Sequence, residues 1–205
     1  MNIFVLCTGR SGSTGFIKAC KHITNYTASH ESKSQLFGEK RFAFSENHIE
    51  ADNRLSWQLG ELEKKFGEKA FYVHLIREPR EVAQSFMHRY LLPKSMIYAY
   101  ANGIKKQPPE RLNPAQRFEM CMDYVETVNS NIDAFLKDKP LKITIELKHI
   151  KPDFKTFWNA IEAEGNLELA LKEFDTKHNK RPSKSYDLNY SLKNLWLKLK
   201  MILRG

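Results

Sequence analysis

The sequence has few cysteines and no long apolar run. Its three cysteines, Cys7, Cys20 and Cys121, form no C-x-x-C pair. An odd set without such pairs argues against a disulfide framework and a zinc knuckle, so we expect a reducing compartment. No apolar segment approaches 18 residues, and the short run Ile3–Leu6 behind Met1 lacks the flanks of a signal peptide. We therefore expect a soluble, cytoplasmic protein.

The sequence also lacks internal repeats and low-complexity tracts, and 41% of its residues are hydrophobic. A chain of 205 residues can bury one substantial core. Two independent cores would leave each half near the lower limit of useful burial. We therefore predict a single domain over residues 1–205.

Positive charge, by contrast, is abundant. The chain holds 33 Lys and Arg against 24 Asp and Glu, a formal net charge of +9. Residues 172–205 alone contain nine Lys or Arg and three Asp or Glu. Such an excess indicates an anionic partner, which is a nucleic acid, an acidic membrane surface or a highly phosphorylated small molecule. Charge alone does not choose among the three.

Short β-favouring runs alternate with helical patterns along the chain. We predict strands over residues 2–7, 25–29, 70–76 and 141–145, and helices over 13–22, 52–66, 114–136 and 153–163, with one more beginning at Pro79. This alternation predicts an α/β fold, a three-layer sandwich with a mostly parallel central sheet. Residues 93–113, rich in Tyr, Pro and Lys, are the least regular segment and a candidate cover for a ligand.

A glycine- and hydroxyl-rich turn follows the first strand, and reads Thr8-Gly9-Arg10-Ser11-Gly12-Ser13-Thr14. A strand, a glycine turn and a helix start aim backbone N–H groups at an anion. The two glycines permit close approach of the backbone, the hydroxyls add donors, and Arg10 adds a fixed positive charge. The turn is not a Walker A motif, because Ser13 stands where that motif requires a lysine. An ordinary strand-to-helix turn with only capping roles is the alternative.

A second candidate anion site follows the strand over residues 70–76. It consists of Arg77 at the strand end and Ser85, eight residues later on the predicted helix. The first turns of this helix advance about 9 Å, so a long arginine side chain folding back from the strand reaches the same anion. A guanidinium binds phosphate through two parallel hydrogen bonds. The alternative for Arg77 is a surface salt bridge to Glu78 or Glu81, and the neighbouring Arg80 is left outside the site for the same reason.

The two segments resemble the donor-binding motifs of the sulfotransferase superfamily, whose members transfer a sulfuryl group from 3′-phosphoadenosine 5′-phosphosulfate (PAPS). The run from Cys7 to Thr14 looks like the family's 5′-phosphosulfate loop, in the arginine form R-S-G-S/T-S/T of carbohydrate, tyrosylprotein and bacterial sugar sulfotransferases. Cytosolic members carry Lys in place of Arg10. The stretch from Val73 to Ser85 resembles the family's 3′-phosphate segment, an apolar strand followed by R-D/E-P-R and a helical serine.

The resemblance implies a P-loop NTPase-like sulfotransferase fold, PAPS as donor and PAP as product, with no metal requirement. Residues 8–14 with Arg77 and Ser85 would bind the donor. The partners would be this nucleotide and an acceptor hydroxyl, with no nucleic acid. The donor motifs do not identify the acceptor, and the arginine form of the loop favours a carbohydrate.

The general base is expected just after the second strand, at His30-Glu31. In a parallel sheet this position shares the carboxyl edge with the first loop. Several sulfotransferases carry a catalytic glutamate in this region, so the resemblance favours Glu31 as base, with His30 as the alternative. Arg10 would stabilise charge on the leaving group. An exposed ion pair between Glu31 and Lys33 is the non-catalytic alternative.

Three other titratable residues are weighed for the same role. His48 is an alternative base because cytosolic sulfotransferases use a histidine reached after a longer segment, and Asp52 is another. His74 lies inside an apolar strand and is interpreted as a hydrogen-bonded core histidine. No histidine has a convincing metal-ligand spacing, so no metal site is predicted.

The basic tail carries two further predictions. Asn179, Lys180 and Arg181 lie in a basic stretch that weakly resembles the superfamily's late loop over the nucleotide, and a solvated linker is the alternative. Apolar residues at helical spacing predict a basic amphipathic helix over about residues 188–203. Packing on its own domain is expected for this helix, with peripheral contact to an anionic membrane or a partner as alternatives.

Other functions stay open beside the sulfotransferase. A P-loop nucleotide kinase or hydrolase is disfavoured by the missing Walker lysine. A nucleic-acid-binding module suits the basic charge, but no helix-turn-helix, zinc-finger or RNA-recognition pattern supports it. A non-catalytic nucleotide-binding protein is a further alternative because the base is the least secure assignment.

Overall fold

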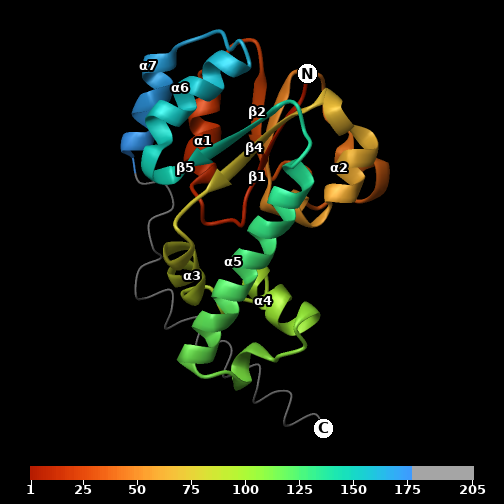
Figure 1. The fold of residues 1–205 in the computed structure, drawn as a ribbon, viewed down its shortest axis with the longest axis vertical. Coiled ribbons are helices and arrows are strands. Elements are labelled where there is room, and N and C mark those ends of the chain that lie inside the picture. Colours follow the sequence, from red (N-terminus) through yellow and green to blue (C-terminus); the bar gives the residue numbers. More distant parts are fainter. Residues whose placement is uncertain (177–205) are drawn as a thin grey trace.

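A computed structural model describes residues 1–176, which form an α/β protein around a five-stranded, all-parallel sheet (Figure 1). The strands are β1 (Ile3–Leu6), β2 (Thr27–His30), β3 (His48–Ala51), β4 (Phe71–Ile76) and β5 (Lys142–Glu146), in the spatial order β2-β3-β1-β4-β5. The α-helices are α1 (Ser13–Cys20), α2 (Leu59–Lys65), α3 (Pro79–Met87), α4 (Met96–Ala99), α5 (Pro114–Leu136), α6 (Ile150–Ala160) and α7 (Leu167–Lys172). The predicted α/β class and parallel sheet are confirmed.

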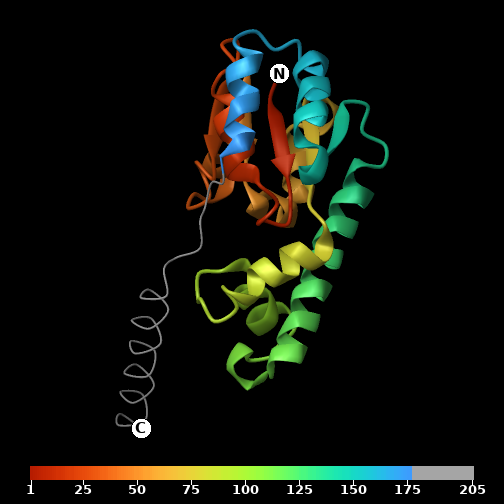
Figure 2. The same cartoon turned by 90° about the vertical axis from the view of Figure 1, so that its left-hand side faces the viewer.

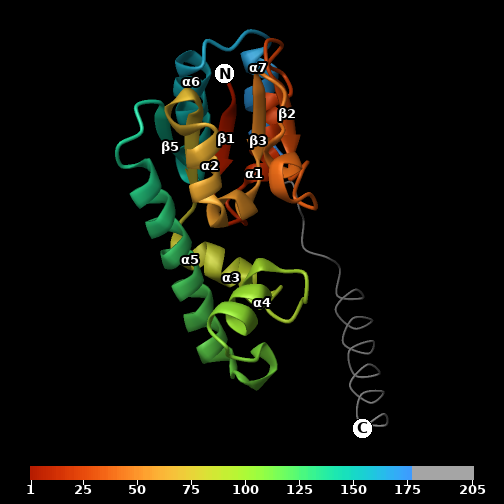
Figure 3. The same cartoon turned by 90° about the vertical axis from the view of Figure 1, so that its right-hand side faces the viewer.

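Helices cover both faces of the sheet. Ile3 and Val5 of β1 pack in one core cluster, with α1, α6 and α7, and Phe4 and Leu6 pack in the other, with α2, α3 and α5. This division follows from the strand backbone, in which successive side chains point to opposite faces. Because both faces are covered, β1 is apolar throughout. Figures 2 and 3 show the two sides of this three-layer arrangement.

Helix α5 joins the sheet to a smaller helical lobe. The helix begins with a capping box, in which Asn113 and Gln116 each accept a hydrogen bond from the other's backbone N–H, and Pro114 occupies its first position. Its 23 residues span about 35 Å. Near its C-terminus Phe135 packs edge-on against Tyr72 of the sheet, with ring centroids 5.1 Å apart. Its N-terminal half runs past the carboxyl ends of the strands, beside α3 and α4 (Figure 1).

Strand β3 is the main element that the sequence prediction missed. Its residues, His48-Ile49-Glu50-Ala51, are all buried although two of them are ionisable. The Glu50 carboxylate accepts hydrogen bonds from the backbone N–H and the hydroxyl of Ser32, at 2.7 and 2.6 Å, and lies 3.0 Å from the His48 ring. Hydrogen-bond partners from elsewhere in the chain therefore make this polar sequence suitable for a buried strand, and periodicity does not reveal them.

Other boundaries differ from the predictions in smaller ways. The helix expected over residues 52–66 divides into a 3₁₀ helix, η2 (Asn53–Trp57), and α2, because the Asp52 carboxylate accepts a hydrogen bond from the Arg54 N–H and fixes a separate turn. The second strand begins two residues later than predicted, α6 begins three residues earlier, and α7 was not predicted. Helix α5 has the predicted bounds.

Two predictions lie outside the described residues. These are the basic loop with Asn179, Lys180 and Arg181, and the amphipathic helix over residues 188–203. The single-domain assignment stays a prediction. No helix in the described part of the chain is long and apolar enough to cross a membrane.

Candidate functional site

The candidate site lies at the carboxyl edge of the sheet, where the predicted residues converge. β1 is the central strand, and β3 and β4 pair with it on either side. After β1 the chain forms β2 and β3 on one side of this strand, and then β4 and β5 on its other side. Such a reversal of strand order is a switch point, where α/β proteins bind ligands at the carboxyl edge. The helical lobe of α3, α4 and α5 lies next to the same edge (Figures 1 and 2).

The turn after β1 has the backbone of an anion cradle. Gly9, Arg10 and Gly12 have positive φ angles of 78°, 61° and 91°. The φ of 91° at Gly12 lies in the region that favours glycine, and a Cβ atom there would also displace a methyl group of Leu147, 2.7 Å away. Gly12 is the N-cap residue of α1 and supplies no side-chain cap, and the first turn of α1 holds no acidic residue. The helix start therefore presents its partial positive charge toward the site.

Two of the predicted hydroxyl groups turn inward. The Thr8 hydroxyl donates to the Gly9 carbonyl at 2.9 Å and lies 2.9 Å from the Ser11 hydroxyl, and both side chains are buried. The Tyr124 hydroxyl donates to the Thr8 carbonyl at 2.8 Å. The hydroxyl groups of Thr8 and Ser11 therefore shape the turn, and the predicted contact of these two residues with a ligand stays a prediction. Burial also raises the pKa of the adjacent Cys7 thiol to about 12, which keeps it neutral.

The two sequence motifs meet in space. The Arg10 Nε donates to the Ser85 hydroxyl at 3.0 Å, and the Arg77 Nη1 donates to the Arg10 carbonyl at 3.3 Å. Burial, and then the neighbouring charges of Arg89 and Arg77, lower the pKa of the Arg10 guanidinium. Within residues 1–176 no ion pair joins Arg10 or Arg89 to an acid. The β1 and β4 ends thus hold an excess of positive charge.

The salt-bridge alternative for Arg77 is realised together with its contact to the turn. Its Nε donates to Glu81 at 2.8 Å, one helical turn into α3, and Glu81 is more than half exposed. Arg80 does not pair with Glu81, and lies over the Phe118 ring at 5.6 Å. Arg77 is therefore directed to the site while Arg80 faces the helical lobe.

Arg89 is a candidate site residue that sequence reasoning missed. It lies in the turn after α3, four residues beyond Ser85. If the helix were continued to Arg89, this residue would share a face with Ser85, because residues four apart on a helix lie on the same face. The spacing was therefore the available sequence signal for Arg89. The helix ends at Met87, and only the three-dimensional structure places the Arg89 charge beside Arg10.

The β2 and β3 ends carry carboxylates. Glu31 has a positive φ of 52°, and its backbone N–H donates to the Ala51 carbonyl at 3.0 Å. Its carboxylate pairs with Arg54 at 2.9 Å, and Lys33, the predicted non-catalytic partner, forms no ion pair with it. The same Arg54 nitrogen lies 3.7 Å from Asp52, whose other oxygen pairs with buried Arg41 at 2.6 Å.

The second base candidate contacts the β1 turn directly. The His30 Nε2 lies 2.9 Å from the Ser13 hydroxyl at the start of α1. β3 separates β2 from β1 in the sheet, so this contact bridges across the end of β3. It brings two of the predicted site residues, His30 and Ser13, into contact.

The remaining candidates fall outside the site or inside its supporting structure. His48 is the first residue of β3, at the amino edge, so its assignment as an alternative base was wrong on position. Asp52 is at the carboxyl edge but fully buried, and burial raises its pKa against the opposing effects of Arg54 and Arg41. His74 is a hydrogen-bonded core histidine, as predicted, with Asp133 and Asn129 as partners.

Among residues 1–176, no group of three or more His, Cys, Asp or Glu side chains is placed to hold a metal ion. No protein-family model and no curated protein matches the sequence.

Proposed function

We propose that this protein is a sulfotransferase that moves the sulfuryl group of PAPS to an acceptor hydroxyl. The observation that carries the proposal is the contact of Arg10 with Ser85 and of Arg77 with the Arg10 carbonyl. These contacts join two sequence segments 67 to 75 residues apart, each of which resembles one half of a PAPS site. The all-parallel sheet with helices on both faces is compatible with the proposed sulfotransferase fold.

The chemistry of the donor suits the arrangement of charges. PAPS carries a 3′-phosphate and a 5′-phosphosulfate, and so needs two neighbouring cationic sites. Arg77, Ser85 and Arg89 would hold the 3′-phosphate, and the turn over residues 8–14 with the start of α1 would hold the 5′-phosphosulfate. Arg10 and Arg89, which have no acidic partner within residues 1–176, would then find their counter-charge in the ligand.

The groups of this site can supply both the proton acceptor and the positive charge that the transfer step needs. The acceptor oxygen forms a bond to sulfur while the bond from sulfur to the bridging oxygen breaks, and that electron pair leaves on the 5′-phosphate of PAP. Glu31 takes the proton of the attacking hydroxyl, with His30 as the second candidate for this role. Arg10 stabilises the charge that develops on the leaving oxygen. The products are the sulfate ester and PAP.

The proposal is tested by calorimetric titration with PAP, ADP and ATP. PAP, with two phosphomonoesters, has the same full charge as ATP and the same number of phosphates as ADP, so a preference for PAP over both reports the 3′-phosphate and not total charge. Arg77→Ala should weaken PAP binding about tenfold or more, because it removes a charge-assisted pair of hydrogen bonds. Arg80→Ala, a change of the same type three residues away, should leave PAP affinity unchanged. No PAP binding, or a preference for ATP, would contradict the proposal and favour P-loop kinase or hydrolase chemistry.

A further inference from the structure

Glu50 of β3 is a fully buried carboxylate that binds Ser32, the residue next to Glu31. Its Oε1 accepts a hydrogen bond from the Ser32 backbone N–H at 2.7 Å, and its Oε2 accepts one from the Ser32 hydroxyl at 2.6 Å. Oε2 also lies 3.0 Å from the His48 Nε2. The distances to Ser32 are those of charge-assisted hydrogen bonds, so the carboxylate holds this residue firmly.

A carboxylate is an unfavourable choice for the interior of a sheet. Its neighbours in β3, Ile49 and Ala51, are apolar and fully buried. An apolar side chain at position 50 would avoid the desolvation of a charge, so burial alone does not explain Glu50. The contacts with Ser32 indicate what the carboxylate contributes, because they hold the chain just where it leaves β2.

Glu31 has a backbone conformation that needs support from its surroundings. Its φ of 52° lies in the left-handed region, which residues other than glycine seldom adopt. The Glu31 N–H donates to the Ala51 carbonyl at 3.0 Å, and the next N–H, that of Ser32, donates to Glu50. β3 therefore binds the backbone on both sides of the Glu31 Cα atom. Such strained conformations persist where the surrounding structure fixes them, and they cluster at functional sites.

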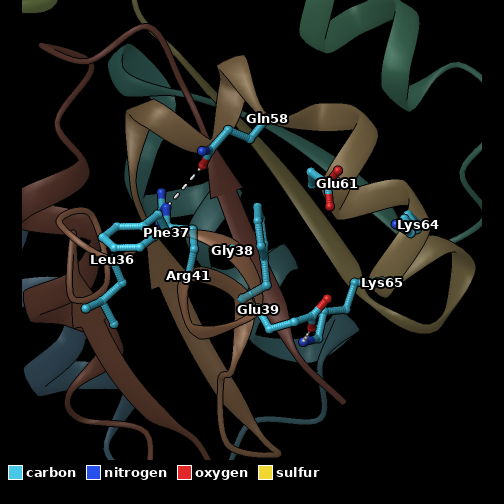
Figure 4. A pocket seen from close by; sticks show the side chains of 10 residues that line it. Leu36, Phe37, Gly38, Glu39, Arg41, Gln58, Glu61, Lys64 and Lys65 are labelled. Carbon is cyan, nitrogen blue, oxygen red and sulfur yellow. Dashed lines mark hydrogen bonds and ion pairs between the residues drawn. The ribbon is translucent and has the colours of Figure 1, made fainter.

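The segment that follows the candidate base is attached to β3 at its far end as well. It leads into the 3₁₀ helix η1 (Gly38–Phe42), where the Arg41 Nη2 lies 2.6 Å from the carboxylate of Asp52, the residue after β3. The Arg41 Nε donates to the Gln58 side-chain carbonyl at 3.1 Å, in the wall of a cavity between η1 and α2 (Figure 4). Glu50 and Asp52 therefore hold this segment at its two ends.

We propose that Glu50 is a positioning residue for Glu31, which it holds in the left-handed conformation. Its part in transfer rests on the proposed function. In this conformation the Glu31 carboxylate lies 2.9 Å from Arg54. Burial and, more weakly, the Glu31 charge raise the pKa of the Cys7 thiol to about 12, so this charge also acts on the end of β1. An extended residue 31 would continue β2 and direct its side chain differently.

The test is a double-mutant cycle on the full chain, followed as release of sulfate from radiolabelled PAPS with water as the acceptor. The water oxygen bonds to sulfur, the bond from sulfur to the bridging oxygen breaks with its electron pair leaving on PAP, and Glu31 takes a water proton. Glu50→Leu removes the acceptor of both Ser32 groups, so kcat should fall about tenfold or more while the KM for PAPS stays within about twofold. In Glu31→Gln, the same substitution should change kcat less than about twofold, because Glu50 acts through Glu31. Equal fold losses in both backgrounds would overturn the inference.

Glu50→Gln is the conservative variant. Its side-chain oxygen still accepts the Ser32 N–H, so kcat should stay within about threefold of the wild type. The matched control is His48→Gln, which alters the other partner of Glu50 and leaves Ser32 in place. It should leave kcat near the wild-type value, because His48 lies at the amino edge of the sheet. A loss in His48→Gln as large as in Glu50→Leu would assign Glu50 to strand packing and contradict its role as a positioning residue.

Backbone NMR tests the conformation of Glu31 directly and reports whether each variant is folded. The three-bond coupling between the amide and α protons of Glu31 depends on φ, so it should change in Glu50→Leu and stay unchanged in Glu50→Gln. An unchanged coupling in folded Glu50→Leu would refute the inference. If Glu50→Leu does not fold, Ser32→Ala at an exposed residue removes one of the two donors, and kcat should fall about threefold, again only with Glu31 present. The same loss with and without Glu31 would count against the inference in this variant too.

A PAP titration of the wild type separates this inference from the proposed function. No PAP binding would overturn the sulfotransferase, and the role of Glu50 in transfer with it. PAP binding without turnover of PAPS would leave the donor site intact, and would overturn the catalytic role of Glu31 and hence that of Glu50. PAP binding and turnover, with equal losses from Glu50→Leu in both backgrounds, would overturn the role of Glu50 alone.

Discussion

The two halves of the carboxyl edge, at the ends of β1 and β4 and at the ends of β2 and β3, differ in whether their arginines are paired with carboxylates. At the ends of β1 and β4, Arg10 and Arg89 have no acidic partner among the described residues. At the ends of β2 and β3, each arginine meets a carboxylate, as in the Arg54–Glu31 and Arg41–Asp52 pairs. Unbalanced charge in a half-buried place is unfavourable unless a ligand neutralises it, whereas a paired charge is already compensated within the protein. Under the proposed function, the first half would bind the anionic donor and the second half would position the base.

The largest expected effect separates chemistry from donor binding. Glu31→Gln removes the proposed base but no cation, so we expect transfer to fall about 100-fold or more. PAP affinity should stay within about twofold of wild type. The measurements are sulfated product formation with radiolabelled donor, and calorimetry with PAP. Glu146→Gln, which changes an exposed carboxylate at the end of β5, is the matched control. Equal loss of PAP binding and of transfer would contradict the proposal that Glu31 acts in the chemical step and not in donor binding.

The next effect tests whether the β3 half is held together by paired charge. Asp52→Asn leaves Arg41 buried without a carboxylate, and should lower the free energy of unfolding by about 3 kcal/mol. Replacing both partners, in Arg41→Met with Asp52→Leu, should recover part of that loss because no unpaired charge stays buried. Urea denaturation measures both variants. Glu39→Gln, which breaks the exposed pair with Lys65, should cause little change. A similar effect from Asp52→Asn and Glu39→Gln would mean that the buried pair is not needed.

A smaller effect tests whether Arg89 belongs to the cationic half, at the ends of β1 and β4. Arg89→Ala should weaken PAP binding about fivefold, and should reduce the salt dependence of that binding because one cation fewer faces the ligand. Arg111→Ala, in an exposed turn of the helical lobe, is the control for net charge. Calorimetry at two salt concentrations gives both quantities. Equal effects from the two variants would assign Arg89 a general electrostatic role without direct contact.

The smallest effect concerns a titratable group outside both halves. Burial lowers the pKa of His74 below its ordinary value of 6.5, so the unfolded chain takes up this proton more readily than the folded one. Stability should therefore fall as the pH drops below about 6.5, by less than about 1.4 kcal/mol per pH unit from this group. His74→Gln should unfold with a flatter pH dependence in this window. Urea unfolding at pH 7 and pH 5.5 gives the change in the free energy of unfolding between the two pH values. The same change in wild type and His74→Gln would contradict this assignment.

Much of the fold was predictable because its signals are local. The glycine turn after β1, Pro79 at the start of α3 and the bounds of α5 all follow from turn, cap and helix patterns. β3 was not predictable, because His48 and Glu50 are compatible with a buried strand only through partners elsewhere in the chain. The contact between Arg10 and Ser85 joins the two predicted segments in space, whereas the charge of Arg89 beside them was not predicted.

The sequence by itself determined the succession of strand, turn and helix and the two cationic segments, because backbone preference and side-chain charge are properties of neighbouring residues. Only the tertiary structure decided which charges are matched. β3 lies between β2 and β1, so it places Asp52 and Arg54 beside Glu31 and leaves Arg10 on the side of Arg77 and Arg89. Strand order depends on how whole faces pack, and the energy of a charge depends on which groups surround it after packing.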